Sequence, residues 1–330
     1  MHLRFATVPA TKSVTQWIAP MLLLSVLLLS GCAGSAKARA ELEANAVDLL
    51  QVLSADDMGG RAPGTPGHAK AKAVILSRLE ALELRAPEGG HARDFRFGPP
   101  GAPEKVRTGA NLIGWIAGET PGRGPALVVT AHYDHLGREE GEIFNGADDN
   151  ASGVAALIAI AEHLRRVPPQ HDVWIVALDA EETNLSGAAA FLETPPLARD
   201  RIALNVNLDM VSRPDGKGLW AAGPNHTPAL RPLVQAVAAE TALPLQIGFD
   251  GADPDQQDWT LLSDHGVFHR AGIPFLYLGV QDHPDYHQPT DTFDRIDPAD
   301  FLACVDASIR IVVAADRQLD QLARETAQPR

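Results

Sequence analysis

Four short apolar runs constrain most strongly what this chain can fold into. Each is rich in Leu or β-branched residues and is apolar at nearly every position, as in strands that are buried on both faces of a sheet. Segments with helical spacing separate the runs, and such alternation indicates a mostly parallel sheet between layers of helices. We therefore predict an α/β fold, a three-layer α/β/α architecture with a mixed, mostly parallel central sheet. The runs are PALVVTAH (125–132), DVWIVALDAEE (172–182), IALNVNLDM (202–210) and IPFLYLGV (273–280).

The segments around these runs complete the predicted organisation. ANLIGWIAG (110–118) predicts a further strand, and residues 213–260, with their Gly, Pro and Asp clusters, predict an insertion that helps to form a pocket. The sequence contains no internal repeat and no interdomain linker, so we expect residues 32–330 to form a single domain. Apolar residues at helical spacing predict helices at 36–54, 66–84, 152–166, 186–193, 228–241, 263–271 and from 298 to about 323.

The first residues predict a targeting segment. Arg4 precedes an apolar run, 17–29, that is too short for a comfortable membrane span. The run ends in LLSGCAG, which resembles a bacterial lipobox, where segment 1–31 is removed and Cys32 is lipidated. An ordinary secretory signal with an incidental cysteine is the alternative. Because Ala33 resembles the residue found in lipoproteins passed to the outer membrane, we expect a lipid-anchored protein on the periplasmic side of the cell envelope.

Composition limits the remaining possibilities. The formal net charge of −14 argues against nucleic acid as a partner, because phosphate backbones require a positive surface. Cys304 lies in the apolar pattern FLACVDASIRIVVAA and is predicted to be a small core residue. If Cys32 carries lipid, Cys304 has no partner for an intrachain disulfide. Nothing in the sequence indicates the oligomeric state.

Polar residues follow the predicted strands at the edge where ligands bind in open parallel sheets. Each has an ordinary explanation by itself: a surface or core histidine, a helix start or a capped turn. Together, histidines and carboxylates at successive strand ends, without a cysteine among them, suit zinc, with cobalt or manganese as substitutes. We therefore predict a metal site at this edge. The residues that meet there are His132, Asp134, His135, Glu181, Glu182, Asp209, His287 and the acidic turn GADDN with Asp148 and Asp149.

Five motifs in this order resemble the co-catalytic di-zinc metallopeptidase family, which includes bacterial leucine aminopeptidases, glutamate carboxypeptidase and the glutaminyl cyclases. The resemblance extends from about Leu53 to Arg295, and GGRAPGTPG (59–67) resembles the start of many secreted members. It implies the zinc-peptidase fold, related to phosphorylases and hydrolases, and two zinc ions per chain. The motifs are AHYDHLG (131–137), NGADDNASGVAAL (145–157), ALDAEE (177–182), NLDM (207–210) and DYHQPTDT (285–292).

The resemblance also implies a role for each matched residue. One zinc is expected on His132 and Asp209, the other on Glu182 and His287, with Asp149 as the bridge between them. The bond from Asp149 to Asn150 is expected to be cis. Glu181 is the expected general base, which takes a proton from the attacking water and returns it to the leaving amine. Asp134 is expected to orient the imidazole of His132.

Several nearby residues stay unassigned. SDHGVFHRAGIP (263–274) resembles another motif of the family, in which Asp264, His265 and Phe268 line or support the pocket, although a structural role for His265 is equally open. His135 and His283 match no ligand position, and His283 is interpreted as a surface loop residue.

The leading functional hypothesis is a zinc-dependent aminopeptidase that acts on peptides with a free N-terminus. A glutaminyl cyclase that uses one zinc is the main alternative. A carboxypeptidase for acidic C-terminal residues is disfavoured, because only Arg213 and Arg270 lie near the motifs. A binding domain without catalysis is disfavoured because every expected ligand position and the base are filled.

Overall fold

The computed structural model describes residues 2, 18–99 and 102–326, with side chains for 2, 36–99, 102 and 104–325. The chain divides into two compact units, Met1–Leu42 and Glu43–Arg330, and the site described below lies in the second unit. Cys32 lies outside the residues whose side chains are described, as do residues 3–31, so the lipobox stays a prediction. Among the described helices, none combines the length and hydropathy that a membrane span requires.

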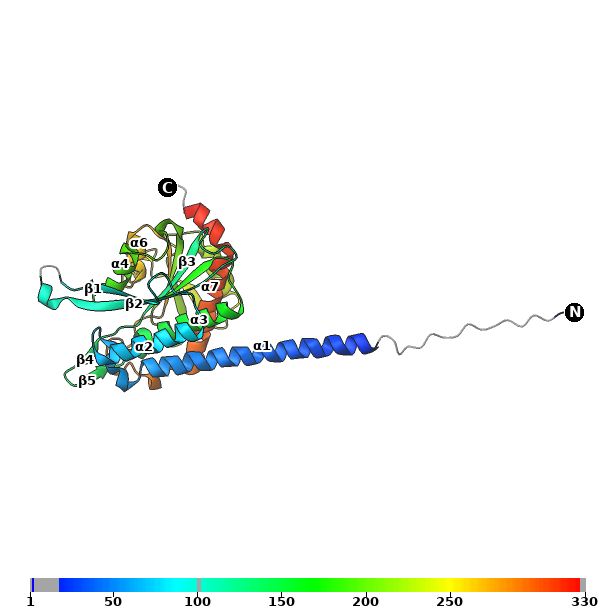
Figure 1. Ribbon diagram of the computed structural model, residues 1–330, viewed down its shortest axis with the longest axis horizontal. Helices are drawn as coiled ribbons and strands as arrows, with labels where there is room; N and C mark the ends of the chain where they lie inside the picture. The colour runs from blue at the N-terminus through cyan, green and yellow to red at the C-terminus, as the bar shows by residue number, and fades with distance from the viewer. Residues whose placement is uncertain (1, 3–17, 100–101, 327–330) are drawn as a thin grey trace. The chain divides into compact units, whose positions relative to one another are not determined.

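An eight-stranded mixed sheet forms the centre of the second unit (Figure 1). Its strands are β1 Ala92–Phe97, β2 Arg107–Ile116, β3 Ala126–His132, β6 Asp172–Leu178, β7 Ile202–Leu208, β8 Leu219–Ala222, β9 Leu245–Ile247 and β10 Phe275–Gly279. Their order across the sheet is β1-β2-β6-β3-β7-β10-β8-β9. The four central strands run parallel, whereas β1–β2, β2–β6 and β10–β8 pair antiparallel. The predicted fold class is confirmed.

Helices cover both faces of this sheet. The α-helices are α1 Ile18–Leu53, α2 Pro66–Ala81, α3 Gly153–Arg166, α4 Ser186–Glu193, α5 Leu230–Ala238, α6 His265–Arg270 and α7 Pro298–Thr326. Short turns of other helix types are η2 Asp56–Arg61, η3 Pro103–Lys105, η4 Ala147–Ser152, η5 Arg199–Arg201 and η6 Phe293–Arg295. Helices α3 and α7 contact each other and the central strands, while α4 and α6 contact each other and form the opposite layer.

The central strands are buried because both of their faces are covered. Every residue of β3, β6, β7 and β10 is buried. On one face, Val128 and Trp174 belong to a core cluster with Phe191 of α4 and Phe268 of α6. Removing a large apolar side chain of this kind from water contributes roughly 1.5–3 kcal/mol, so burial on both faces stabilises these runs as central strands. Their near-continuous apolar character was the signal that predicted them.

The sequence analysis missed the edge strand β1 and a short hairpin, whereas β8 and β9 lie in the predicted insertion 213–260. β1 has the sequence ARDFRF, whose charged side chains suit a strand at the edge of the sheet. The hairpin of β4, Gly137–Glu139, and β5, Glu142–Phe144, pairs only within itself and has no apolar run. Helices α5 and α6 are also shorter than the predicted segments 228–241 and 263–271.

The register of the parallel strands aligns their carboxyl ends. His132 of β3 pairs with Leu178 of β6. Leu208 at the end of β7 pairs with Leu278 near the end of β10. The residues that follow these strands therefore emerge at one edge of the sheet, which is the edge that the sequence predicted for the site.

Candidate metal centre

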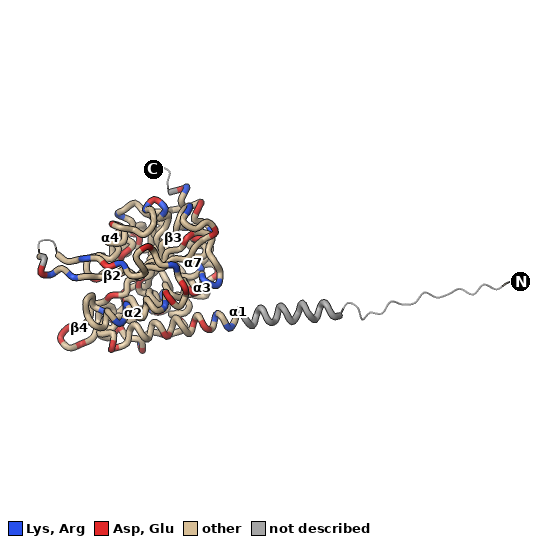
Figure 2. The backbone as a smooth tube through the Cα atoms, in the orientation of Figure 1, with Lys and Arg blue, Asp and Glu red and all other residues tan. Residues whose placement is uncertain are grey.

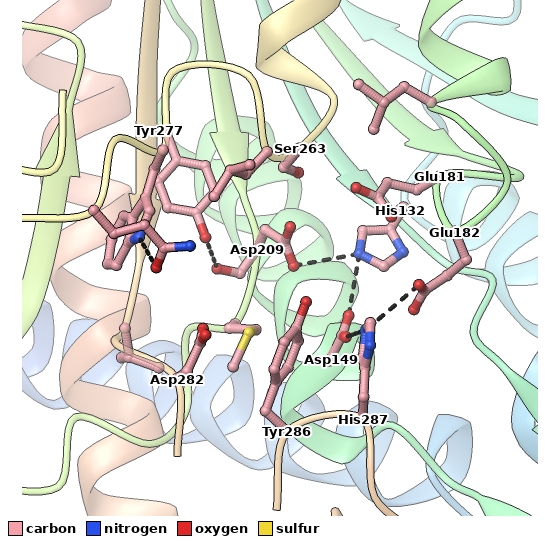
Figure 3. Close-up of a pocket in the computed structure, with 16 residues that line it drawn as sticks. His132, Asp149, Glu181, Glu182, Asp209, Ser263, Tyr277, Asp282, Tyr286 and His287 are labelled. Carbon is pink, nitrogen blue, oxygen red and sulfur yellow. Dashed lines mark hydrogen bonds and ion pairs between the residues drawn. The ribbon is translucent and has the colours of Figure 1, made fainter. Parts of the chain in front are cut away.

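A cavity of about 410 Å³ opens at this edge (Figure 3). Side chains from segments far apart in the chain line it and converge on its centre. Asp134 is buried beside the cavity without lining it. Its Oδ1 accepts a hydrogen bond from the backbone N–H of Glu181 at 3.0 Å. The structure thus brings together all seven predicted site residues of the domain. The six that line the cavity are His132, Asp149, Glu181, Glu182, Asp209 and His287.

His132 faces two carboxylates at the end of β3. Its Nε2 lies 3.3 Å from Oδ1 of Asp149 and 3.3 Å from Oδ1 of Asp209. Asp209 directly follows β7, so the parallel pairing of β3 and β7 holds the two residues side by side. The backbone carbonyl of Asp209 accepts a hydrogen bond from the hydroxyl of Tyr277 on β10 at 3.0 Å, which fixes the Asp209 backbone from the next strand.

His287 faces a second pair of carboxylates. Its Nε2 lies 3.0 Å from Oδ2 of Asp149 and 3.4 Å from Oε2 of Glu182. The two oxygens of Asp149 therefore face different histidines. Asp149 joins two halves of one site, with His132 and Asp209 on one side and His287 and Glu182 on the other.

His135 is a member of the cluster that the sequence analysis left unassigned. Its Nδ1 lies 2.8 Å from Oε1 of Glu182 and 3.8 Å from Oδ2 of Asp149, and its Nε2 has no hydrogen-bond partner among the described residues. Its place in AHYDH, three residues after His132, could have indicated this position. Nδ1 of His132 lies 3.2 Å from the backbone oxygen of Asp134 but 3.7 Å from its carboxylate, so the backbone makes the closer contact.

The turn that carries Asp149 has a backbone that only particular residues allow. Gly146 has φ +56°, and a Cβ at this position would lie 2.0 Å from the backbone oxygen of Asp149, so glycine is required there. The bond between Asp149 and Asn150 is cis, as the family resemblance implied. The amide of Asn150 holds the turn against the end of β7, since its Nδ2 donates to the carbonyl of Leu208 at 2.9 Å.

Asp148 points away from the cluster, although it is the neighbour of Asp149. Its Oδ1 accepts hydrogen bonds from the backbone N–H and the hydroxyl of Ser212 at 2.8 and 2.6 Å. Its Oδ2 lies 3.1 Å from Nε2 of His283, which is buried with only 8% exposure. The interpretation of His283 as a surface loop residue is therefore wrong. The carboxylate of Asp291 holds the same turn by accepting the backbone N–H groups of Asp148 and Asp149.

A fully buried arginine supports this turn from behind. Arg61, in the motif GGRAPGTPG, donates to four backbone carbonyls and to no carboxylate. Burial lowers its pKa to about 10, against the opposing fields of Asp149 and Asp291. It remains a cation at neutral pH and offsets part of the negative charge of the cluster. The four acceptors are the carbonyls of Leu53, Tyr133, Asn145 and Gly146.

The density of acids shifts the ionisation of the groups around the cavity. Burial raises the pKa of Glu181 well above its ordinary value, and the charges of Asp264 and Asp209 raise it further against the lowering effect of His132. Burial likewise raises the pKa of Asp264 to about 8, and neither of its carboxylate oxygens has a hydrogen-bond partner among the described residues. A raised pKa is what a carboxyl group needs to accept and release a proton near neutral pH.

The donor set fits a divalent metal. Donor atoms of His132, Glu181 and Asp209 lie within 4.8 Å of one another, and so do those of His135, Asp149 and Glu182. Imidazole nitrogens and carboxylate oxygens without thiolates suit zinc. Carboxylates this close repel each other, and a cation between them removes that repulsion.

Comparison with known proteins places the chain among peptidases. Residues 111–312 match the description "Peptidase family M28". The chain is 30% identical over 201 residues to "Aminopeptidase YwaD" of Bacillus subtilis, covering 58% of this chain and 41% of that protein. It is 27% identical over 303 residues to "Probable lipoprotein aminopeptidase LpqL" of Mycobacterium tuberculosis, covering 81% of this chain and 56% of that protein. The chain thus spans about half the length of these curated relatives.

A solved structure described as BSAP, a zinc aminopeptidase from Bacillus subtilis, has the same fold. It superposes with a TM-score of 0.64 at 18% identity, and the match covers 82% of this chain and 94% of that structure. The family match covers more than half of the present chain and contains every residue of the cluster from His132 to His287. The chain belongs to peptidase family M28, as the ordered motifs of its sequence indicated.

Proposed function

We propose that this protein is a zinc-dependent aminopeptidase that removes N-terminal residues from peptides, with two zinc ions per chain. The observation that carries the proposal is the position of Asp149, whose two carboxylate oxygens lie within 3.3 Å of two different histidines. A carboxylate in this position can bridge two metal ions. His132 and Asp209 would hold one ion, and Glu182 and His287 the other. The similarity to the relatives named as aminopeptidases supports the same class of reaction.

The residues around the cavity have different roles in hydrolysis. Two zinc ions bound there would polarise the substrate carbonyl and lower the pKa of water to near neutral. Glu181 takes the proton from the attacking water and delivers it to the leaving amine. Asp134 positions Glu181 by accepting its backbone N–H. Adjacent Glu181 and Glu182 thus have separate tasks, since Glu182 faces His135 and His287 while Glu181 forms no ion pair in the described structure.

The charges of the cavity favour an N-terminal over a C-terminal substrate. None of the described residues that line it is Lys or Arg, so no basic side chain of the lining can bind a free C-terminal carboxylate. Arg213, which the sequence placed near the motifs, does not line the cavity and is paired with Asp285 and Asp215. Arg270 ends helix α6 and does not line the cavity either.

A direct test uses the purified full chain in detergent, loaded with zinc. We expect hydrolysis of leucine anilide, no hydrolysis of its N-acetylated form, and two zinc ions per chain by mass spectrometry. Hydrolysis of both forms would refute action at a free N-terminus. One zinc per chain, together with cyclisation of an N-terminal glutamine without release of an amino acid, would support acyl transfer instead.

We also propose that Cys32 anchors the protein to the cell envelope, on the periplasmic side of the outer membrane. The sequence LLSGCAG and the relative described as a lipoprotein aminopeptidase support this location. Metabolic labelling with palmitate, followed by density separation of the two membranes, tests it. We expect label in the outer-membrane fraction for the native chain and none for Cys32→Ser. Equal labelling of both proteins would refute lipidation at Cys32.

A further inference from the structure

One carboxylate in the cavity has no role in the proposed metal centre. Asp282 lines the cavity together with the metal-site residues and is exposed. Figure 3 shows it on the side of Tyr286, across the cavity from Glu181. It forms no hydrogen bond or ion pair within the described part of the chain, whereas Asp149, Glu182 and Asp209 all face histidines.

The backbone around Asp282 is held in place on both sides. The N–H of Val280 donates to the carbonyl of Met210 at 2.8 Å. On the other side, His283 lies 3.1 Å from Asp148 through Nε2 and 3.1 Å from Nη1 of Arg213 through Nδ1. Asp282 therefore belongs to a segment that is anchored at the cavity by both of these neighbours.

Within the described residues, no Lys or Arg pairs with Asp282. The guanidinium of Arg213, which contacts the neighbouring His283, is engaged by Asp285, by His283 and by Asp215 at 3.6 Å. The cavity lining itself contains no Lys or Arg among its described residues. If two divalent ions are bound as proposed, their charge balances the three ligand carboxylates and Glu181. Among the described residues that line the cavity, Asp282 then carries the remaining negative charge, which is available to the substrate.

The same cavity also has an apolar part of its lining. Five of its lining residues are apolar, and Leu262 is 55% exposed, so apolar area is open to a ligand. The methylene stems of Lys and Arg pack on such surfaces while their charged ends reach a polar partner. The apolar residues are Leu185, Met210, Trp259, Leu262 and Val280.

We propose that Asp282 is a specificity-determining residue, which makes the enzyme prefer substrates with a basic side chain, Lys or Arg, next to the cleaved bond. The inference rests on the proposed aminopeptidase function, because it concerns the substrate of the same site. The carboxylate attracts the ammonium or guanidinium group of that side chain, and the apolar wall receives its stem.

The test compares pairs of substrates that differ in charge and little else. Anilides of arginine and citrulline form one pair, and those of lysine and norleucine form the other. For the zinc-loaded full chain at low salt, we expect a higher kcat/KM for the charged member of each pair. Asp282→Asn should lower kcat/KM about fivefold for the two basic substrates, as expected for a partly exposed ion pair, and leave the neutral ones unchanged. Added salt should reduce the native preference.

The matched control is Asp200→Asn. Asp200 is an exposed carboxylate just before β7, at the opposite end of the strand from the cavity. Asp200→Asn should leave all four values of kcat/KM unchanged. An equal loss on all four substrates in Asp282→Asn would mean that Asp282 holds the α-ammonium group, and would overturn the proposal, as would no loss at all.

A binding measurement separates this inference from the proposed function. Calorimetric titration of the zinc-loaded protein with the free amino acids arginine and citrulline, which have no amide bond to cleave, does not depend on turnover. Tighter binding of arginine that disappears in Asp282→Asn supports the role of Asp282, even if no anilide is hydrolysed. Equal binding of the two amino acids overturns that role, even if hydrolysis of leucine anilide confirms the aminopeptidase.

Discussion

The two halves of the metal centre share Asp149 but differ in how the fold holds them. In the His132 half, the side chains of His132, Asp149 and Asp209 are only 1%, 5% and 12% exposed, and two of these residues end or directly follow central strands. In the other half, the side chain of His287 is 36% exposed. His287 lies outside the helices and strands and has φ +53°, a conformation that residues other than glycine rarely adopt.

This difference separates a half that is buried throughout from a half with one accessible member, His287 on a loop, since the side chain of Glu182 is only 11% exposed. We call them the buried half and the accessible half. Groups at strand ends are fixed by the same packing that stabilises the sheet, so the His132 half is costly to disturb even without metal. A metal ion bound in the His287 half would exchange with solvent more easily. We therefore expect the two proposed ions to differ in how quickly they leave.

The largest effect is expected when the shared residue is changed. Asp149→Asn removes the charge that faces both His132 and His287, so zinc content should fall from two ions to less than one and activity should become undetectable. Metal analysis after dialysis against zinc-free buffer measures this. Asp148→Asn is the matched control, because Asp148 faces Ser212 and His283, and it should keep most of its zinc. Equal zinc loss in both variants would contradict a bridging role for Asp149.

The next effect separates chemistry from metal binding. Glu181→Gln should reduce kcat by about 10²–10⁴-fold, the range for loss of a general acid–base group, while both ions stay bound. Steady-state kinetics and metal analysis of the same preparation test this. A variant that loses zinc in proportion to its activity would show that Glu181 is a ligand instead, which its closeness to His132 and Asp209 allows geometrically.

Changing one histidine at a time compares the two halves directly. His132→Ala leaves Asp209 buried without its imidazole partner in the metal-free protein, and breaking a buried pair in this way costs about 3 kcal/mol or more. His287→Ala removes a partly exposed partner and should destabilise the metal-free fold much less. Thermal unfolding of both variants after chelation measures the difference. Equal losses of Tm would refute the division into a buried and an accessible half.

The same contrast explains what the sequence could predict. The central strands and the residues at their ends were predictable, because burial on both faces leaves a continuous apolar run and the strand order brings its ends together. The ligand pattern of His132, Asp149 and His287 came from the resemblance to a family. The geometry of the site is consistent with that pattern, and the ligand roles themselves stay predictions.

Other features depend on contacts that leave no local signal. His283 stands between Asp282 and Pro284 in QDHPDYHQ and looks like a loop residue, yet its buried partner Asp148 lies 135 residues away. The role of Arg61 depends likewise on carbonyls from distant turns. The edge strand β1 carries charges on a short segment and forms only because β2 lies beside it.

The smallest expected effect concerns pH and the accessible half alone. Burial lowers the pKa of His287, but its hydrogen bonds to Asp149 and Glu182 outweigh burial and raise the pKa from 6.5 to about 10. Because the folded pKa is raised, protonated His287 stabilises the metal-free fold fully below pH 6.5, and this contribution is lost as the pH rises through about 10. The Tm of the metal-free native protein should therefore fall more steeply over this range than that of His287→Ala.

Zinc should reverse this dependence. A metal-bound imidazole must be neutral, so protons compete with zinc for His287 and zinc affinity should increase with pH. Competition with a chelating dye between pH 6 and 8 measures the affinity of each ion. Burial lowers the pKa of His132, but its carboxylate neighbours outweigh burial and raise that pKa well above its ordinary value as well. We therefore expect the affinity for both ions to increase with pH over this range, and an affinity that does not change with pH in the accessible half would contradict the role of His287 as a ligand.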